Sequence, residues 1–239
     1  MHDPLVLIPG MMCDARVFED QILKLTLDRA VMIAVPTLGE RIEDMAAMLL
    51  NQLPERFALA GFSMGGMVAM DILRRAPERV TRIALMDTSP LPETPAGAAE
   101  YEPWIVGAMA GKLDEVLRSF MRPDYLAPGV GRAQILARFH EMGMGLGADL
   151  FIRQARAMQR RPDQQKTLRQ CKVPALVMCG EHDQLTPPKR HSFMAELIPT
   201  AELHLIEEAG HFPTLERPKA VSAILGDWLA KGDQDAQTS

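Results

Sequence analysis

The sequence predicts an α/β fold: a mostly parallel sheet of about six strands with helices on both faces. Three observations predict it. Short apolar runs alternate along the chain with longer segments in which apolar residues recur at helical spacing. The short runs are apolar throughout, as expected of strands covered on both faces. Strand–helix alternation is in turn typical of a parallel sheet between two layers of helices.

Six apolar runs of strand length are the candidates for this sheet. The first, residues 5–8, stops at Pro9 and Gly10, which favour a turn. The other five are residues 30–35, 57–60, 82–86, 175–178 and 202–206.

Helical patterns fill the segments between these runs. Residues 64–73 follow the third run and have the composition of an apolar helix. Pro187 suits the first turn of a later helix, because a proline there forgoes no helical hydrogen bond. Gly232 favours an end to the last helix. The apolar stripe of that last helix consists of Val221, Ile224, Leu225, Trp228 and Leu229.

One segment, residues 90–162, interrupts the alternation. It has no strand pattern and consists of helical stretches separated by Pro and Gly, so we expect a helical insertion after the fourth strand. The predicted core then comprises residues 1–89 and 163–232. The polar residues 233–239 are expected to form a disordered tail.

Composition and charge exclude several classes of protein. With 47% hydrophobic and 24% charged residues, the 239-residue chain is typical of a soluble globular domain with a sizeable core. The net charge of −5 argues against binding to nucleic acid or to an anionic membrane. No apolar run approaches the roughly 18 residues that a membrane span needs. The apolar stretch near the N-terminus is too short for a signal peptide, so we expect a cytoplasmic protein.

Cysteine spacing gives no sign of a disulfide framework or a metal site. The spacings match neither CxxC nor a metal finger, so we expect free thiols in a reducing compartment. Glu181, His182 and Asp183 offer potential ligands, but no second ligand cluster accompanies them and no metal is expected. The three cysteines are Cys13, Cys171 and Cys179.

The stretch "GFSMG" places Ser63 between a predicted strand and a predicted helix. The pattern G-x-S-x-G at such a turn is typical of a nucleophile elbow, in which Gly61 and Gly65 permit a tight backbone. The helix beginning at Met64 would direct its free N–H groups and positive end toward the serine, where negative charge develops during acyl transfer. A serine that only caps a helix is the alternative interpretation.

A serine hydroxyl needs a base, and the base needs an orienting group. The elbow predicts the chain order serine, acid, histidine. Asp183 follows the run 175–178 in "GEHDQLTPP", and His211 follows the run 202–206 in "EEAGHFPTLERP". Because the carboxyl ends of parallel strands share one edge, we expect these two side chains to meet Ser63 there.

One aspartate and two histidines are the other candidates for these roles. Asp87 follows the fourth run and is the rival acid, although a loop-capping aspartate in "MDTSP" is the preferred interpretation. His191 falls on the helix after Pro187 and is expected to be solvated. His182 adjoins Asp183, and adjacent loop residues seldom point the same way.

Four motifs carry a resemblance to a known family: "LIPGMMCDARVF", "GFSMGG", "CGEHDQLTP" and "AGHFPTLERP". The chain resembles the alpha/beta-hydrolase superfamily over nearly its whole length. It is most similar to the small bacterial esterases grouped with enol-lactonases and pimeloyl-ester hydrolases. The resemblance implies that Ser63 is the nucleophile, His211 the general base and acid, and Asp183 the orienting carboxylate. It also implies that residues 90–162 form a helical lid and that no cofactor is needed.

The chain departs from the family pattern in two places. Family members commonly have His-Gly after the first strand, where this sequence has Pro9 and Gly10. The resemblance assigns the oxyanion hole to the backbone N–H groups of Met11 and Met64, with Met12 as an alternative. Because these donors belong to the main chain, the proline need not abolish the hole. The second departure is the absence of the usual N-terminal antiparallel hairpin.

The resemblance implies hydrolysis of a small-molecule ester, thioester or lactone with a small to medium acyl group, through an acyl-enzyme. An acyltransferase, a perhydrolase or a non-catalytic ligand-binding protein on the same fold are the alternatives, and the oligomeric state is left open. The side chains expected at the substrate are Met12, Phe62, Met109, Met142 and Phe212.

Two further groups lie in the predicted insertion. Its methionines are suited to an adaptable pocket, although ordinary packing of the helices explains them as well. Its arginines are spaced to form one basic helix face, which is either solvated or binds a carboxylate or phosphate. The methionines are Met109, Met121, Met142, Met144 and Met158, and the arginines are Arg153, Arg156, Arg160 and Arg161.

Overall fold

The computed structural model describes residues 2–129 and 131–235, and the side chains as far as residue 231. Six parallel strands form one sheet in the order β2-β1-β3-β4-β5-β6, which confirms the predicted fold class. The strands are β1 (Leu5–Ile8), β2 (Val31–Ile33), β3 (Phe57–Phe62), β4 (Val80–Met86), β5 (Ala175–Gly180) and β6 (Ala201–Ile206).

The burial of each strand follows from its place in the sheet. Every residue of β1, β3 and β5 is buried, because helices cover both faces of these inner strands. The edge strand β6 is mostly exposed, including the side chains of Leu203 and Leu205. The predicted alternation of apolar runs and helical segments therefore corresponds to a sheet whose inner strands lie in the core.

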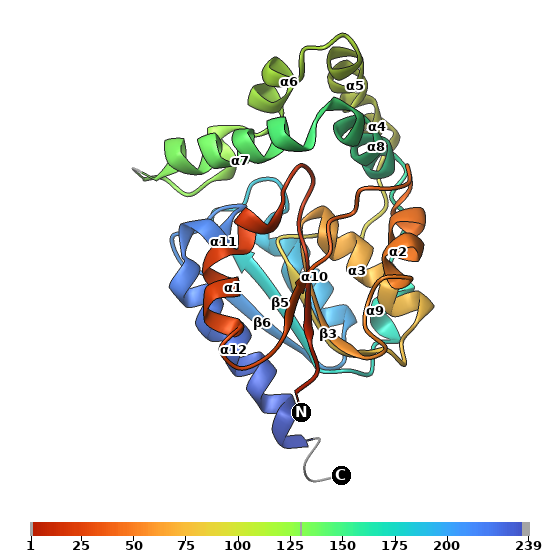
Figure 1. Ribbon diagram of the computed structural model, residues 1–239, viewed down its shortest axis with the longest axis vertical. Helices are drawn as coiled ribbons and strands as arrows, with labels where there is room; N and C mark the ends of the chain where they lie inside the picture. The colour runs from red at the N-terminus through yellow and green to blue at the C-terminus, as the bar shows by residue number, and fades with distance from the viewer. Residues whose placement is uncertain (1, 130, 236–239) are drawn as a thin grey trace.

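Helices cover the sheet in two layers (Figure 1). On one face, α1 (Glu19–Leu25) packs against α12 (Pro218–Asp235), next to the short α11 (Pro213–Glu216) and the 3₁₀ turn η1 (Ala15–Phe18). On the other face, α3 contacts α2 and α9, and α9 contacts α10. The bounds of this second group are α2 (Ile42–Leu50), α3 (Met64–Arg75), α9 (Gln165–Arg169) and α10 (Pro188–Leu197).

Two helix ends differ from the sequence prediction. Pro188, not Pro187, is the first residue of α10, and Pro187 is the residue before it. The last helix, α12, continues past Gly232 to Asp235, so the glycine does not end it. A glycine without the left-handed conformation of a C-terminal cap leaves a helix free to continue. The expected disorder of residues 233–239 is wrong for residues 233–235, which belong to α12, and residues 236–239 lie outside the described residues.

Residues 90–162, named the insertion below, form a helical layer above the sheet (Figure 1). As predicted, no described residue in it belongs to a strand. Its two ends are adjacent in space: the N–H of Gln164 donates to the carbonyl of Pro90 over 2.8 Å, and the N–H of Glu93 donates to the carbonyl of Arg161 over 3.3 Å. The elements of the insertion are α4 (Pro95–Glu100), α5 (Glu102–Met109), α6 (Leu113–Phe120), η2 (Pro123–Tyr125), α7 (Arg132–Leu146) and α8 (Ala148–Gln159).

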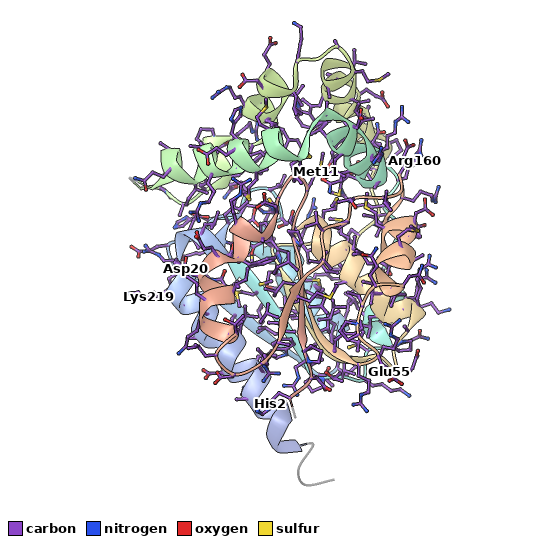
Figure 2. The ribbon with its side chains drawn as sticks, viewed as in Figure 1. His2, Met11, Asp20, Glu55, Arg160 and Lys219 are labelled. Carbon is purple, nitrogen blue, oxygen red and sulfur yellow. The ribbon has the colours of Figure 1, made fainter. Side chains whose placement is uncertain are left out.

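The junction of sheet and insertion holds the loop after β1. Met11 lies there, directly below the helices of the insertion, whereas Arg160 lies on the outer side (Figure 2). Among the helices of the described residues, none has the length and hydropathy required to cross a bilayer.

Candidate active site

Ser63 occupies a sharp turn between β3 and α3. Its backbone has φ 53° and ψ −119°, a conformation that non-glycine residues rarely adopt. A Cβ on Gly65 would collide with the carbonyl oxygen of Ile8, and one on Gly61 with the carbonyl oxygen of Gly65. Both glycines are therefore required by contacts with the main chain, which is what the G-x-S-x-G pattern predicts.

The neighbouring strand β4 holds the turn in place. The N–H of Ser63 donates to the carbonyl of Met86 over 2.9 Å. The hydroxyl of Thr88 donates to the carbonyl of Ser63 over 2.7 Å. With its main chain fixed at two points, the Ser63 side chain has a defined direction despite the unfavourable φ angle.

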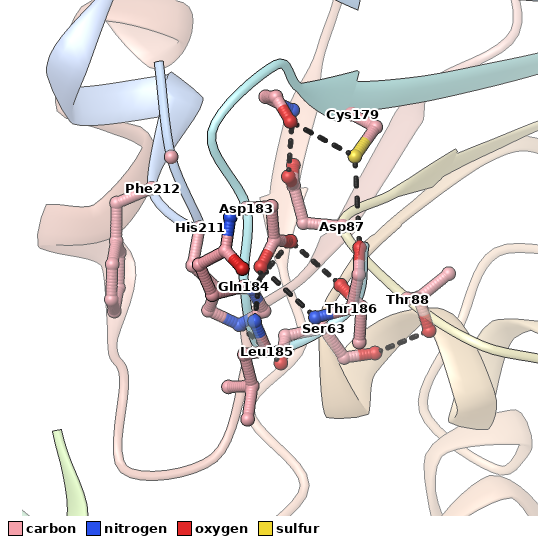
Figure 3. A network of polar contacts seen from close by, with 12 residues as sticks. Ser63, Asp87, Thr88, Cys179, Asp183, Gln184, Leu185, Thr186, His211 and Phe212 are labelled. Atoms are coloured by element: carbon pink, nitrogen blue, oxygen red, sulfur yellow. Dashed lines mark hydrogen bonds and ion pairs between the residues drawn. The ribbon is translucent and has the colours of Figure 1, made fainter. Parts of the chain in front are cut away.

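Ser63, His211 and Asp183 form one chain of hydrogen bonds (Figure 3). His211 Nε2 lies 3.0 Å from Ser63 Oγ, and His211 Nδ1 lies 2.9 Å from Asp183 Oδ2. Since a carboxylate only accepts hydrogen bonds, Nδ1 must be the protonated ring nitrogen. Nε2 is then free to accept the serine proton. The sequence predicted these three residues, and the structure brings them together.

Asp183 is buried, and its hydrogen-bond partners stabilise the ionised form of its carboxyl group. Its Oδ1 accepts hydrogen bonds from the N–H groups of Leu185 and Thr186, over 2.8 and 2.9 Å. Its Oδ2 accepts from the Thr186 hydroxyl over 2.7 Å as well as from His211. Burial by itself raises the pKa of Asp183, but the His211 ring and these donors outweigh it and lower the pKa to about 2.

His211 is fixed by its surroundings as well as by Asp183. Its backbone N–H donates to the carbonyl of Tyr125 over 2.7 Å, which links it to the insertion. The Phe62 and Phe212 rings lie 5.4 and 5.6 Å from the imidazole, centroid to centroid. This aromatic packing leaves the ring few orientations besides the one that faces Ser63.

His191 and Asp87, the rival candidates, each accept a hydrogen bond from a main-chain N–H group. The prediction that His191 is solvated is wrong: the residue is fully buried, and its Nε2 accepts the Thr88 N–H over 2.9 Å. Burial lowers the pKa of His191 to about 4. Asp87 is also fully buried and accepts the N–H of Gly180, at the end of the neighbouring strand β5, over 2.9 Å. It therefore caps β5 and not its own loop.

The loop after β1 presents the expected main-chain donors. Neither the Met11 nor the Met64 N–H donates a hydrogen bond to another described residue. The Met12 N–H is engaged, because it donates to Gln154 Oε1 over 2.8 Å. Met12 is therefore excluded as the alternative donor, a correction to the sequence prediction. The buried Gln154 on α8 had no signal in the sequence.

A cavity of about 420 Å³ opens above Ser63 and His211. Phe62 and Phe212 line it, as predicted. Three predicted substrate residues do not: Met109 is 65% exposed on the outer side of α5, whereas Met12 and Met142 are fully buried away from the cavity. Helical periodicity identified these methionines but could not show which helix face the fold turns toward the site.

The insertion supplies the far wall of the cavity. Of its methionines, Met121 and Met158 line the wall, together with Trp104. Arg161 also lines it and pairs with Glu93, N to O distance 2.5 Å, with both side chains 10% exposed. No sequence pattern indicated Glu93 or Trp104 as lining residues.

Three of the four arginines in the predicted basic face contact residues 37–40 of the core, and Arg160 pairs with Glu40 at an N to O distance of 3.8 Å. Arg156 forms an ion pair with Glu40 of the core, and Arg153 donates to the carbonyl of Thr37. Arg161 alone of the four lines the cavity. The structure therefore keeps Arg153, Arg156 and Arg160 together and separates Arg161 from them.

One group of potential metal ligands lies beside the site. Oxygen and sulfur atoms of Asp87, Cys179 and Asp183 lie within 4.8 Å of one another. However, hydrogen bonds occupy both oxygens of Asp183, and burial raises the pKa of the Cys179 thiol. A protonated thiol and a fully engaged carboxylate make a poor cation site.

Comparison with known proteins finds a matching family profile and similar sequences. A sequence profile of the alpha/beta hydrolase family matches residues 5–224. A pimeloyl-[acyl-carrier protein] methyl ester esterase from Aromatoleum aromaticum is 29% identical over 213 residues, which cover 80% of this chain and 81% of that protein. A 2-hydroxymuconate semialdehyde hydrolase from a Pseudomonas species is 29% identical over 201 residues, covering 81% of this chain and 69% of that protein.

Solved structures show the same fold. A thermophilic esterase from Thermogutta terrifontis has a TM-score of 0.88 and 25% identity, covering 97% of this chain and 90% of that chain. The enol-lactonase from Burkholderia xenovorans has a TM-score of 0.85 and 21% identity, covering 96% of this chain and 92% of that chain. With a family profile matched from the first strand to the last helix, the chain belongs to the alpha/beta hydrolase family.

Proposed function

We propose that the protein is a serine hydrolase that cleaves a carboxylic ester through an acyl-enzyme intermediate. The observation that carries the proposal is the hydrogen-bonded chain Asp183–His211–Ser63, whose serine end opens into a cavity. A buried carboxylate, an imidazole with a free Nε2 and a serine on a strained turn are the parts that acyl transfer requires. Similarity to a methyl ester esterase and to a thermophilic esterase supports an ester as the substrate.

In the first step, Ser63 Oγ attacks the ester carbonyl while its proton passes to His211 Nε2. The carbonyl π electrons move onto oxygen, and the resulting anion lies against the N–H groups of Met11 and Met64. Each such donor lowers the barrier by about 3 kcal/mol in comparable enzymes. Asp183 stabilises the imidazolium, which then gives its proton to the departing alcohol as the carbon–oxygen bond breaks.

In the second step, water replaces the alcohol. His211 removes a proton from the water, the oxygen attacks the acyl carbon, and the bond to Ser63 breaks. The proton then returns from His211 to Ser63 Oγ, which restores the starting enzyme and releases a carboxylic acid.

The cavity sets the size of substrate. A volume of about 420 Å³ suits a small to medium acyl group with its alcohol. The insertion forms the far wall and acts as the lid, with Trp104 and Met121 contacting the apolar part of the substrate. A thioester or a lactone fits the same chemistry, because each presents an activated carbonyl to the same hydroxyl.

A fluorophosphonate probe and a series of p-nitrophenyl esters test the proposal. The wild-type protein should be labelled on Ser63 and hydrolyse the esters, whereas Ser63→Ala should lose labelling and about 10⁶-fold in kcat. Ser192→Ala is the matched control, since that hydroxyl donates only to the carbonyl of Pro188 on α10. Hydrolysis that survives in Ser63→Ala would refute the mechanism.

Product analysis separates hydrolysis from acyl transfer on the same triad. With an added alcohol or with peroxide, a hydrolase should still form mainly the free acid. A dominant new ester or peracid would identify a transferase or a perhydrolase instead. A protein that binds esters without any turnover would be a ligand-binding member of the family.

A further inference from the structure

A second buried carboxyl group lies next to the one that orients His211. Asp87 follows β4 and Asp183 follows the neighbouring strand β5, and both are fully buried. One carboxyl oxygen of each residue and the Cys179 sulfur lie within 4.8 Å of one another. Figure 3 shows Asp183 between His211 and Asp87. The mechanism above gives Asp87 no role.

Asp87 is held firmly in this position. Its backbone N–H donates to the carbonyl of Met178 over 2.9 Å, and its Oδ1 accepts the N–H of Gly180 over 2.9 Å. Its φ of 46° lies in the left-handed region, where a non-glycine residue is strained. Its Oδ2 is buried and has no hydrogen-bond partner among the described residues. A strained residue with an unpaired buried oxygen requires an explanation beyond simple packing.

The charges around the pair decide which carboxyl group is ionised. Two buried carboxylates at this distance cannot both carry a negative charge, because their repulsion adds to the cost of burial. Asp183 has three hydrogen-bond donors besides His211, whereas Asp87 has the Gly180 N–H alone.

The other titratable groups around Asp87 do not favour its ionisation. They are the Cys179 thiol and, as a further negative charge, Glu216. Burial first, and then the charge of Asp183, raise the pKa of Asp87 well above its ordinary value.

We propose that Asp87 is a positioning residue of the triad: it stays neutral, anchors the end of β5, and takes over the pair's negative charge when Asp183 has none. The inference rests on the proposed function. Gly180 is three residues before Asp183, so the bond from Gly180 to Asp87 fixes the start of the loop that carries the triad acid. While Asp87 is neutral, the single charge of the pair stays on the carboxyl group that faces His211.

Infrared difference spectroscopy tests the neutral state directly, without any substrate. At neutral pH the wild-type spectrum should contain the carbonyl band of a protonated carboxylic acid, and Asp87→Asn should lose it. Asp124→Asn, which changes an exposed carboxylate, should leave the band unchanged. Absence of the band, or its persistence in Asp87→Asn, would overturn the proposal.

A double-mutant cycle tests the transfer of charge. Asp183→Asn removes the triad charge, and Asp87 should then supply part of it. Replacing Asp87 by Asn should therefore lower kcat at least about tenfold more in the Asp183→Asn background than in the wild type. A residue that only supports the fold would cost the same factor in both backgrounds, and that result would overturn the proposal. If Asp183→Asn had no measurable turnover, the proposal would also be overturned, because Asp87 would not have replaced the lost charge.

Alanine and asparagine variants of Asp87 test whether this residue anchors the end of β5. Asp87→Ala should lower kcat, and Asp87→Asn should recover most of that loss because its amide oxygen still accepts the Gly180 N–H. Equal turnover in wild type and Asp87→Ala would refute the anchoring. Failure of the proposed function is distinguishable: if Ser63→Ala remained active while the infrared band was present, the mechanism would fall and the neutral state of Asp87 would stand.

Discussion

The backbone N–H of Met12 donates a hydrogen bond to Gln154 Oε1 across 2.8 Å, between residues 142 positions apart. The same amide donates through Nε2 to the carbonyl of Pro36 over 3.0 Å. Gln154 thus ties two core loops to helix α8 of the insertion. Met12 has φ 56° and adjoins Met11, so this bond supports the loop that presents the proposed oxyanion donor.

Gln154→Leu is expected to impair both stability and turnover. The change leaves a buried N–H and a buried carbonyl without partners, which costs about 1–3 kcal/mol each in unfolding free energy. A displaced Met11 N–H should lower kcat by about 100-fold, at the lower end of the effect of removing such a donor. Urea unfolding and ester kinetics measure the two effects. Gln170→Leu changes an exposed glutamine and serves as the control; an equal effect of both variants would contradict the role of Gln154.

Gly65→Ala is expected to disrupt the elbow. The added Cβ would meet the carbonyl oxygens of Ile8 and Pro9, which belong to main chain and cannot turn aside. We expect a loss of about 3 kcal/mol or more in unfolding free energy, and loss of activity. Gly226→Ala in α12 is the matched control, because no heavy atom lies within 4 Å of its new Cβ. That variant should gain about 0.5–1 kcal/mol, since alanine favours a helix.

His191 should make the fold sensitive to mild acid. Its pKa is about 4 in the folded protein against 6.5 ordinarily, so the unfolded chain binds a proton first as the pH falls. The folded state therefore loses stability from about pH 6.5 down to about pH 4, by about 3 kcal/mol in total. His191→Gln should flatten this part of the curve of unfolding free energy against pH. An unchanged slope in the variant would show that the buried imidazole is not its source.

The stability that Asp183 contributes should be lost in acid, because its pKa is lowered in the folded protein. Its pKa is about 2 in the folded protein against 3.8 ordinarily, so the ionised carboxylate stabilises the fold at neutral pH. This contribution, about 2 kcal/mol, is present above pH 4 and is lost as the pH falls toward 2. The difference in unfolding free energy between wild type and Asp183→Asn should shrink over that interval. A difference that stayed constant with pH would contradict the expectation.

The sequence was sufficient for the parts of the site that depend on chain topology. Ser63, Asp183 and His211 each follow a buried apolar run, and parallel strands bring such positions to one edge whatever the details of packing. Asp87 follows the same rule, which made it the rival candidate for the acid. The sequence pattern did not predict that Asp87 would be buried against β5.

The insertion was predictable as helices but not as a binding surface. Met109 and Met142 belong to helices whose faces are chosen by tertiary contacts, and one is exposed while the other is fully buried. Arg161 left the predicted basic face and pairs with Glu93 instead. His191 was assigned to solvent because a lone histidine on a polar helix gives no sign of the Thr88 N–H that it accepts.

The hydrogen bond between Gln164 and Pro90 has a consequence for how this protein could change its specificity. Because the chain leaves and re-enters the core at neighbouring points, a short linker could bridge the two points without stretching any strand. The whole insertion is therefore one segment of chain that could be replaced as a unit. Exchange of the insertion for one of another length or shape would remodel the cavity, provided that the new segment again supplied acceptors for the N–H groups of Met12 and His211.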